Sequence, residues 1–112
     1  MKPLDLNRAL VLETSVRDAD GAGGYVQSWQ PLGTIWAEVL PGTGRDVAGE
    51  EVVLSSVPFR ITVRGAAQGA QARPRAGQRF RDGGRIFAIQ AVTERDATGS
   101  FLVCFVREEI PA

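Results

Sequence analysis

Residues 78–92 read QRFRDGGRIFAIQAV, two strand-like runs joined by Asp82-Gly83-Gly84. Aspartate and glycine adopt the backbone angles that the tight turn of a β-hairpin requires. The runs on either side are rich in aromatic and β-branched residues, which favour extended structure. The stretch therefore predicts a β-hairpin and, with it, an antiparallel sheet.

Upstream of this hairpin, residues 57–65 read VPFRITVRG and alternate between apolar and polar side chains. An alternation with a period of two is typical of a strand with one face toward the core and the other toward solvent. The predicted inward residues are Phe59, Ile61 and Val63, and the predicted outward residues are Arg60, Thr62 and Arg64.

Downstream, residues 100–108 read SFLVCFVRE and are apolar on both faces from Phe101 to Val106, which favours a central strand. The run contains Cys104, the single cysteine of the chain, so an internal disulfide is excluded. Because free cysteine in apolar surroundings is commonly buried, we expect Cys104 in the core of a protein made in the reducing cytoplasm.

The N-terminal part predicts further strands. Residues 9–16, ALVLETSV, form the first, with Glu13 on its polar side, and residues 25–29 resume extended structure after the turn-forming run DADGAGG. Pro31 to Gly33 are interpreted as a break, after which residues 34–40, TIWAEVL, form a separate strand.

Two segments lack strand patterns. Residues 41–56, PGTGRDVAGEEVVLSS, are interpreted as a short helix or an adaptable loop, because Gly49 weakens a helical pattern. Residues 66–77, AAQGAQARPRAG, have no apolar anchor and predict a surface loop. The whole chain, residues 1–112, is expected to form one all-β, mainly antiparallel domain, a six-stranded barrel or sandwich with a long loop or short helical insert.

The composition of the chain narrows the classes of function that we expect. The 112 residues contain 13 basic and 13 acidic residues and no histidine. Without net charge, long-range attraction to nucleic acid or an anionic membrane is not expected, and no stretch approaches the roughly 20 apolar residues of a membrane span. Without histidine, the commonest general base and metal ligand are missing. We therefore do not expect the protein to be an enzyme or to bind a metal or a cofactor. Three local acidic pairs are expected to be solvated: Asp18/Asp20, Glu50/Glu51 and Glu108/Glu109.

Basic residues cluster between positions 73 and 85, where five arginines are interrupted by one acid, Asp82. Three interpretations stay open: charges that protect an edge strand from self-pairing, contacts with a nucleic-acid backbone, or contacts with a partner protein. Phe80 is expected on the face opposite Arg79 and Arg81. The remaining members of the cluster are Arg73, Arg75 and Arg85.

Trp36 falls on the polar side of its strand, beside Glu38. A large aromatic side chain is out of place on the surface of a monomer, so Trp36 predicts a subunit or partner interface. The alternative is a barrel that buries both faces of this strand.

Taken in order, five elements resemble the head-closure (head-tail adaptor or stopper) proteins of tailed phages and gene transfer agents. They are DGAGGYVQSW, TIWAEVLPGTGRD, PFRITVRG, FRDGGRIFAIQAV and LVCFVREE. No single element is a signature, but their order and spacing cover nearly the whole chain.

The resemblance implies a small β-barrel that forms a dodecameric ring at the head-tail junction of a particle. The lack of a continuous apolar segment predicts synthesis in the cytoplasm, and the balanced charges predict a monomer in isolation. It also implies partners: an adaptor protein above the ring, a tail terminator or tail tube protein below, and packaged double-stranded DNA passing through. The predicted interface residues are Trp36, Arg60, Arg64, Arg73, Arg75, Arg79 and Arg81.

In such proteins the insert before the arginine-bearing strand hangs into the channel and closes it, which here corresponds to residues 41–56. The insert carries Asp46, Glu50 and Glu51 against Arg45, so a ring of copies would repel DNA phosphates. The predicted channel residues are Gly42, Gly44, Arg45, Asp46, Gly49, Glu50 and Glu51. A neighbouring ring, such as the tail terminator, and a small nucleic-acid-binding β-barrel are the alternatives.

Overall fold

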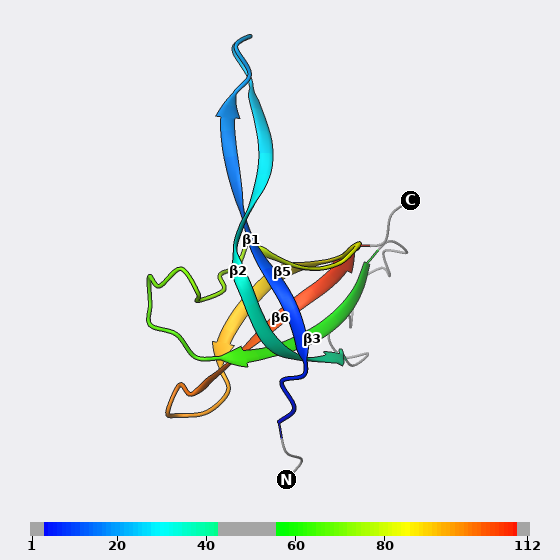
Figure 1. Cartoon of the computed structure of the whole chain (residues 1–112), viewed down its shortest axis with the longest axis vertical. Helices are drawn as coiled ribbons and strands as arrows, with labels where there is room; N and C mark the ends of the chain where they lie inside the picture. Colours follow the sequence, from blue (N-terminus) through cyan, green and yellow to red (C-terminus); the bar gives the residue numbers. More distant parts are fainter. Residues whose placement is uncertain (1–3, 43–55, 110–112) are drawn as a thin grey trace, which may run out of the picture.

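The computed structural model describes residues 4–42 and 56–109. Six antiparallel strands form one sheet that closes into a barrel in the order β1-β2-β3-β6-β5-β4 (Figure 1). The all-β prediction is confirmed, and closure decides for a barrel over a sandwich. The strands are β1 (Arg8–Ala19), β2 (Tyr25–Pro41), β3 (Ser56–Arg64), β4 (Arg79–Asp82), β5 (Arg85–Glu94) and β6 (Phe101–Glu109).

Closure depends on a short contact between the first strand and the fourth. Val11 to Glu13 of β1 pair with Arg79 to Arg81 of β4, while β4 pairs on its other side with β5. Because β4 has a partner on both sides, it is not an edge strand. The interpretation of its arginines as protection of an exposed edge is therefore wrong.

The core fills the barrel with apolar side chains from all six strands. Phe80 of β4 and Phe87 of β5 are fully buried, and the ring of Phe59 meets that of Phe87 edge-on at 5.5 Å. Cys104 is buried as predicted, and burial raises the pKa of its thiol to about 12. The buried apolar residues are Leu10, Leu12, Ala37, Ile61, Val63, Phe80, Phe87, Ile89, Leu102, Cys104 and Val106.

β2 is one continuous strand, so the predicted break at Pro31 to Gly33 is wrong. The register with β1 shifts there instead, with Leu12 opposite Gly33 and Glu13 opposite Pro31. The extra residue, Leu32, forms a bulge and packs against the core. A bulge accommodates proline, which lacks a backbone donor, without ending the strand.

Beyond the bulge, β1 and β2 pair only with each other. The pairing of β1 with β4 ends at Glu13, and that of β2 with β3 begins at Ala37. We call the paired residues 14–19 and 25–30 the arm, which projects from the barrel in Figure 1. It accounts for the elongated shape of the molecule, which measures 55 × 35 × 24 Å.

The hairpin of β4 and β5 forms at the predicted turn, where Asp82 pairs with Arg85 across Gly83 and Gly84. The 66–77 segment is a loop, as predicted, but it has an apolar anchor because Pro74 is fully buried. Arg73 also donates a hydrogen bond of 2.8 Å to the carbonyl of Ala66. The expectation of an unanchored loop is therefore wrong.

Gly65 ends β3 at a place where no side chain fits. A Cβ there would lie 2.1 Å from the carbonyl oxygen of Gly99, and the Gly65 amide donates to Ser100. We expect Gly65→Ala to lower the free energy of unfolding by about 1–3 kcal/mol, because two backbone segments must separate. Urea unfolding measures this effect.

The control is Gly84→Ala, because a Cβ at Gly84 meets nothing within 4 Å and Gly84 has no positive φ. It should change stability by no more than about 0.5 kcal/mol. Equal losses in the two variants would contradict the steric explanation.

Candidate assembly interface

The outside of the barrel over β2, β3 and β6 brings together residues from distant parts of the sequence. Arg60 pairs with Leu40 on one side and with Phe105 on the other. Residues paired across a ladder lie on the same face of a sheet, so these side chains are neighbours. We call this surface the outer face, and it consists of Trp36, Glu38, Leu40, Arg60, Thr62, Arg64, Arg95, Val103 and Phe105.

Large apolar side chains are exposed on the outer face. Trp36 is 59% exposed and Phe105 is 37% exposed. The alternative that the barrel buries both faces of the strand around Trp36 is therefore wrong. The barrel has one interior, and on β2 the side chain of Trp36 alternates away from buried Ala37 and points outward. Clustered apolar side chains on a surface are typical of protein contacts.

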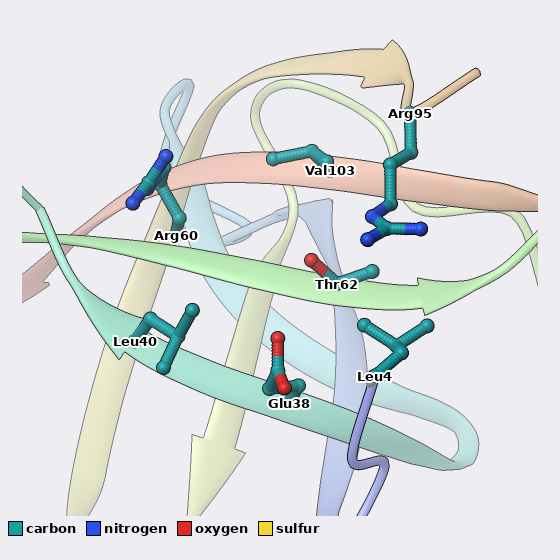
Figure 2. Close-up of a pocket in the computed structure, with 7 residues that line it drawn as sticks. All are labelled: Leu4, Glu38, Leu40, Arg60, Thr62, Arg95 and Val103. Carbon is teal, nitrogen blue, oxygen red and sulfur yellow. The ribbon is translucent and has the colours of Figure 1, made fainter. Parts of the chain in front are cut away.

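A pocket hollows the centre of the outer face (Figure 2). Arg60 and Arg95 lie on either side of it, with Thr62 between them and Leu4 and Leu40 below, as viewed in Figure 2. Thr62 was predicted to be exposed but is only 7% exposed, because the longer side chains around it cover it.

The outer face is basic. Within residues 4–42 and 56–109, Arg60, Arg64 and Arg95 make no ion pair. The single acid of the face, Glu38, accepts a hydrogen bond of 3.0 Å from the amide of Asp5. Guanidinium groups without a carboxylate partner are available to bind an acidic group of another molecule.

The other predicted interface arginines are not on this surface. Arg79 and Arg81 donate hydrogen bonds of 2.7 and 2.9 Å to the two carboxylate oxygens of Glu13. Arg73 and Arg75 lie on the 66–77 loop. The structure thus brings Trp36, Arg60 and Arg64 together and separates them from the remaining four.

Sequence patterns missed the role of Glu13, which was predicted on the solvent side and is only 5% exposed. The Arg79 guanidinium also lies 4.1 Å from the centre of the Trp29 ring, so this group joins β4 to the root of the arm. Arg79 is therefore already engaged within the subunit.

Glu108 was also expected to be solvated, but it accepts two hydrogen bonds, of 2.7 and 3.0 Å, from Arg85. Arg8 of β1 also forms an ion pair with Asp82, which lies at the turn between β4 and β5. Each of the three charged residues of β4, namely Arg79, Arg81 and Asp82, thus forms an ion pair with a residue of β1.

Phe105, Leu40 and Arg95 belong to the outer face but were not predicted. Phe105 alternates with Leu102, Cys104 and Val106, so its place on the opposite side of β6 was visible in the sequence once that strand was known to have only one core face. The place of Arg95, just beyond β5, carried no such signal.

We expect acid to weaken the root of the arm. Burial raises the pKa of Glu13, but hydrogen bonds from Arg81 and Arg79 outweigh it and hold this pKa below its ordinary value of 4.5. A carboxyl whose pKa is lowered by folding stabilises the fold above its unfolded pKa, and this stabilisation is lost as the pH falls through the folded pKa. Glu13→Gln should therefore flatten the decrease in unfolding free energy below about pH 4.5.

Urea unfolding between pH 7 and pH 3 measures this slope. Some slope should remain, because hydrogen bonds from Arg85 also lower the pKa of Glu108. The matched control is Glu109→Gln, which removes an exposed carboxylate that makes no ion pair among the described residues. An identical slope in wild type and Glu13→Gln would contradict the prediction.

The predicted channel insert connects the end of β2 to the start of β3, two strands that pair with each other. Pro41 of β2 pairs with Phe59 of β3, and the Gly42 amide donates a hydrogen bond of 2.9 Å to Pro58. Residues 43–55, which include most of the predicted channel residues, lie outside the described part of the chain.

Within the described residues no helix has the length and apolarity needed to cross a membrane. The same part of the chain holds no group of three or more potential metal ligands.

Comparisons with known proteins show the family and the fold. The model of a family described as phage head completion protein matches residues 1–109. A chain in the structure of the virion of a native gene transfer agent particle is 58% identical, with a TM-score of 0.80, 99% of this chain and 100% of that chain being covered. A Shigella flexneri 2a protein solved in solution shares the fold, with 22% identity, a TM-score of 0.69 and 96% coverage of both chains. No curated protein matches.

Proposed function

The chain belongs to the phage head completion protein family, and from this premise we propose that it is a stopper subunit at the head-tail junction of a gene transfer agent or phage particle. Copies form a ring below the portal and adaptor, retain packaged DNA and offer a docking face to the tail. The 58% identical chain in a gene transfer agent virion supports this assignment.

The observation that carries the proposal is the outer face. A subunit that works alone has no use for exposed Trp36 and Phe105 beside three arginines without ion-pair partners in the described residues. Such a combination of apolar area and arginine is typical of protein interfaces. The nucleic-acid alternative loses support, because Arg79 and Arg81 are both paired with Glu13 within the subunit.

The position of the 41–56 insert fits a closing role. The pairing of β2 with β3 holds the two ends of the insert side by side, so both ends lie at the same end of the barrel. We propose that its copies converge in the ring and that the acidic residues Asp46, Glu50 and Glu51 repel DNA phosphates there.

A strain that lacks the gene tests the function. Electron microscopy of its particles should show heads that have lost their DNA and carry no tails. DNA-filled heads without tails would instead favour a ring on the tail side, such as a terminator. Normal tailed particles would overturn the proposal.

The insert has its own test. Glu50→Ala combined with Glu51→Ala should increase premature loss of the genome, because two negative charges per subunit disappear from the channel. The measurement is the fraction of protected DNA in purified particles. The control pair Glu94→Ala and Glu109→Ala removes the same charge at exposed positions elsewhere. Unchanged retention in the insert variant would count against the acidic constriction.

A further inference from the structure

The arm does not contribute to the closed sheet of the barrel, so its role lies elsewhere. Its two strands pair only with each other and expose Tyr25 by 65% and Val26 by 54%. A two-stranded ribbon is marginally stable in water unless another surface covers it. We therefore expect another surface to cover the arm.

The arm is also held in a defined direction. At its tip, the carboxylate of Asp20 accepts hydrogen bonds of 2.7 and 3.0 Å from the amides of Ala22 and Gly24. At its root, Trp29 stacks under Arg79, which Glu13 holds in place. A ribbon closed at the tip and fixed at the root presents its side chains at low entropic cost.

The two sides of the arm differ chemically. Asp18 lies directly opposite Val26, and Val16 precedes Asp18 on the same side, so the outer half of this side carries two apolar residues and one acid, while Thr14, Ser28 and Gln30 follow toward the root. On the other side, the guanidinium of Arg17 lies 4.6 Å from the centre of the Tyr25 ring. Tyr25 thus has a cation of its own subunit beside it, whereas Val26 has no such partner among the described residues.

The side with Asp18 complements the outer face, where apolar side chains surround Arg60, Arg64 and Arg95. We propose that the arm of one subunit docks through Val16, Asp18 and Val26 on the outer face of the next subunit. This inference rests on the proposed ring and names the contact that builds it.

Geometry supports a contact between different copies. The arm lies at one end of β2, residues 25–30, and the outer face takes up the other end, residues 36–40. Six residues per strand extend the arm about 20 Å beyond the bulge. A contact between two different surfaces of the same chain is heterologous, and it repeats from subunit to subunit, giving a ring when the rotation between subunits closes.

A photo-crosslinking residue at Val26 tests the contact in purified particles. Benzoylphenylalanine at this position should produce a covalent dimer of the chain, with the bond in residues 36–40, 60–64 or 103–105. The same probe at Gln68, an exposed position on the 66–77 loop, should not produce this product.

Charge gives a second readout. Asp18→Arg should reduce the dimer yield at least fivefold, and adding Arg60→Asp and Arg64→Asp should restore it. A crosslink to a different particle protein, no dimer, or an unchanged yield in Asp18→Arg would overturn this inference and leave the proposed function standing. Absence of the wild-type chain from the particles would overturn the proposed function itself.

Discussion

Replacing both Arg60 and Arg64 with Gln is expected to reduce the yield of DNA-filled, tailed particles by more than tenfold. The two guanidinium groups lie on the outer face without ion-pair partners among the described residues, so their loss should cost the subunit little stability. In a ring the same contact recurs at every subunit, so a modest loss at each one accumulates over the assembly.

Functional particles counted by electron microscopy or DNA transfer measure this effect, and thermal unfolding of the isolated variant confirms its fold. Gln68→Glu with Gln90→Glu changes the net charge by the same amount at two exposed positions outside the outer face and should have little effect. Normal particle yield in the arginine variant would exclude the outer face as the assembly contact.

The largest expected effect on stability comes from Phe80→Ala. Phe80 is fully buried on β4, the short strand that closes the barrel against β1. Truncation of a buried phenylalanine costs about 3–5 kcal/mol, from lost apolar burial and from the cavity left behind. Because small domains are stable by only about 5–15 kcal/mol, the variant should be close to unfolded at 37 °C.

Urea unfolding followed by tryptophan fluorescence measures this loss. The control Val57→Ala shortens a side chain of β3 that is 38% exposed, and it should cost less than about 1 kcal/mol. If Phe80→Ala lost no more stability than this control, β4 would not be essential for closing the barrel.

Much of the fold was predictable from local patterns. The turn at Gly83 and Gly84 and the inward positions of Ile61 and Val63 follow from turn chemistry and from the two-residue period of a strand. The apolar, cysteine-containing run of β6 also lies between two other strands, as expected. Each of these features depends on residues that are close together in the sequence.

The candidate site was only partly predictable. Trp36, Arg60 and Arg64 were recognised from their place on the polar side of a strand, and the structure brings them together. The 73–85 cluster was treated as one group of charges, but four of its five arginines contact Glu13, Glu108 or the backbone of the 66–77 loop.

The sequence by itself determined where most of the strands lie, the tight turn at Gly83 and Gly84 and the alternation of apolar side chains, because neighbouring residues decide backbone conformation and alternation. Only the tertiary structure decided the register, the closure of the barrel and the fate of the charges. Glu13 meets arginines 66 and 68 positions away, and the bulge at Leu32 keeps β2 continuous through a proline. Such contacts depend on which strands pair and in what register, and long-range packing of the whole core selects that pairing.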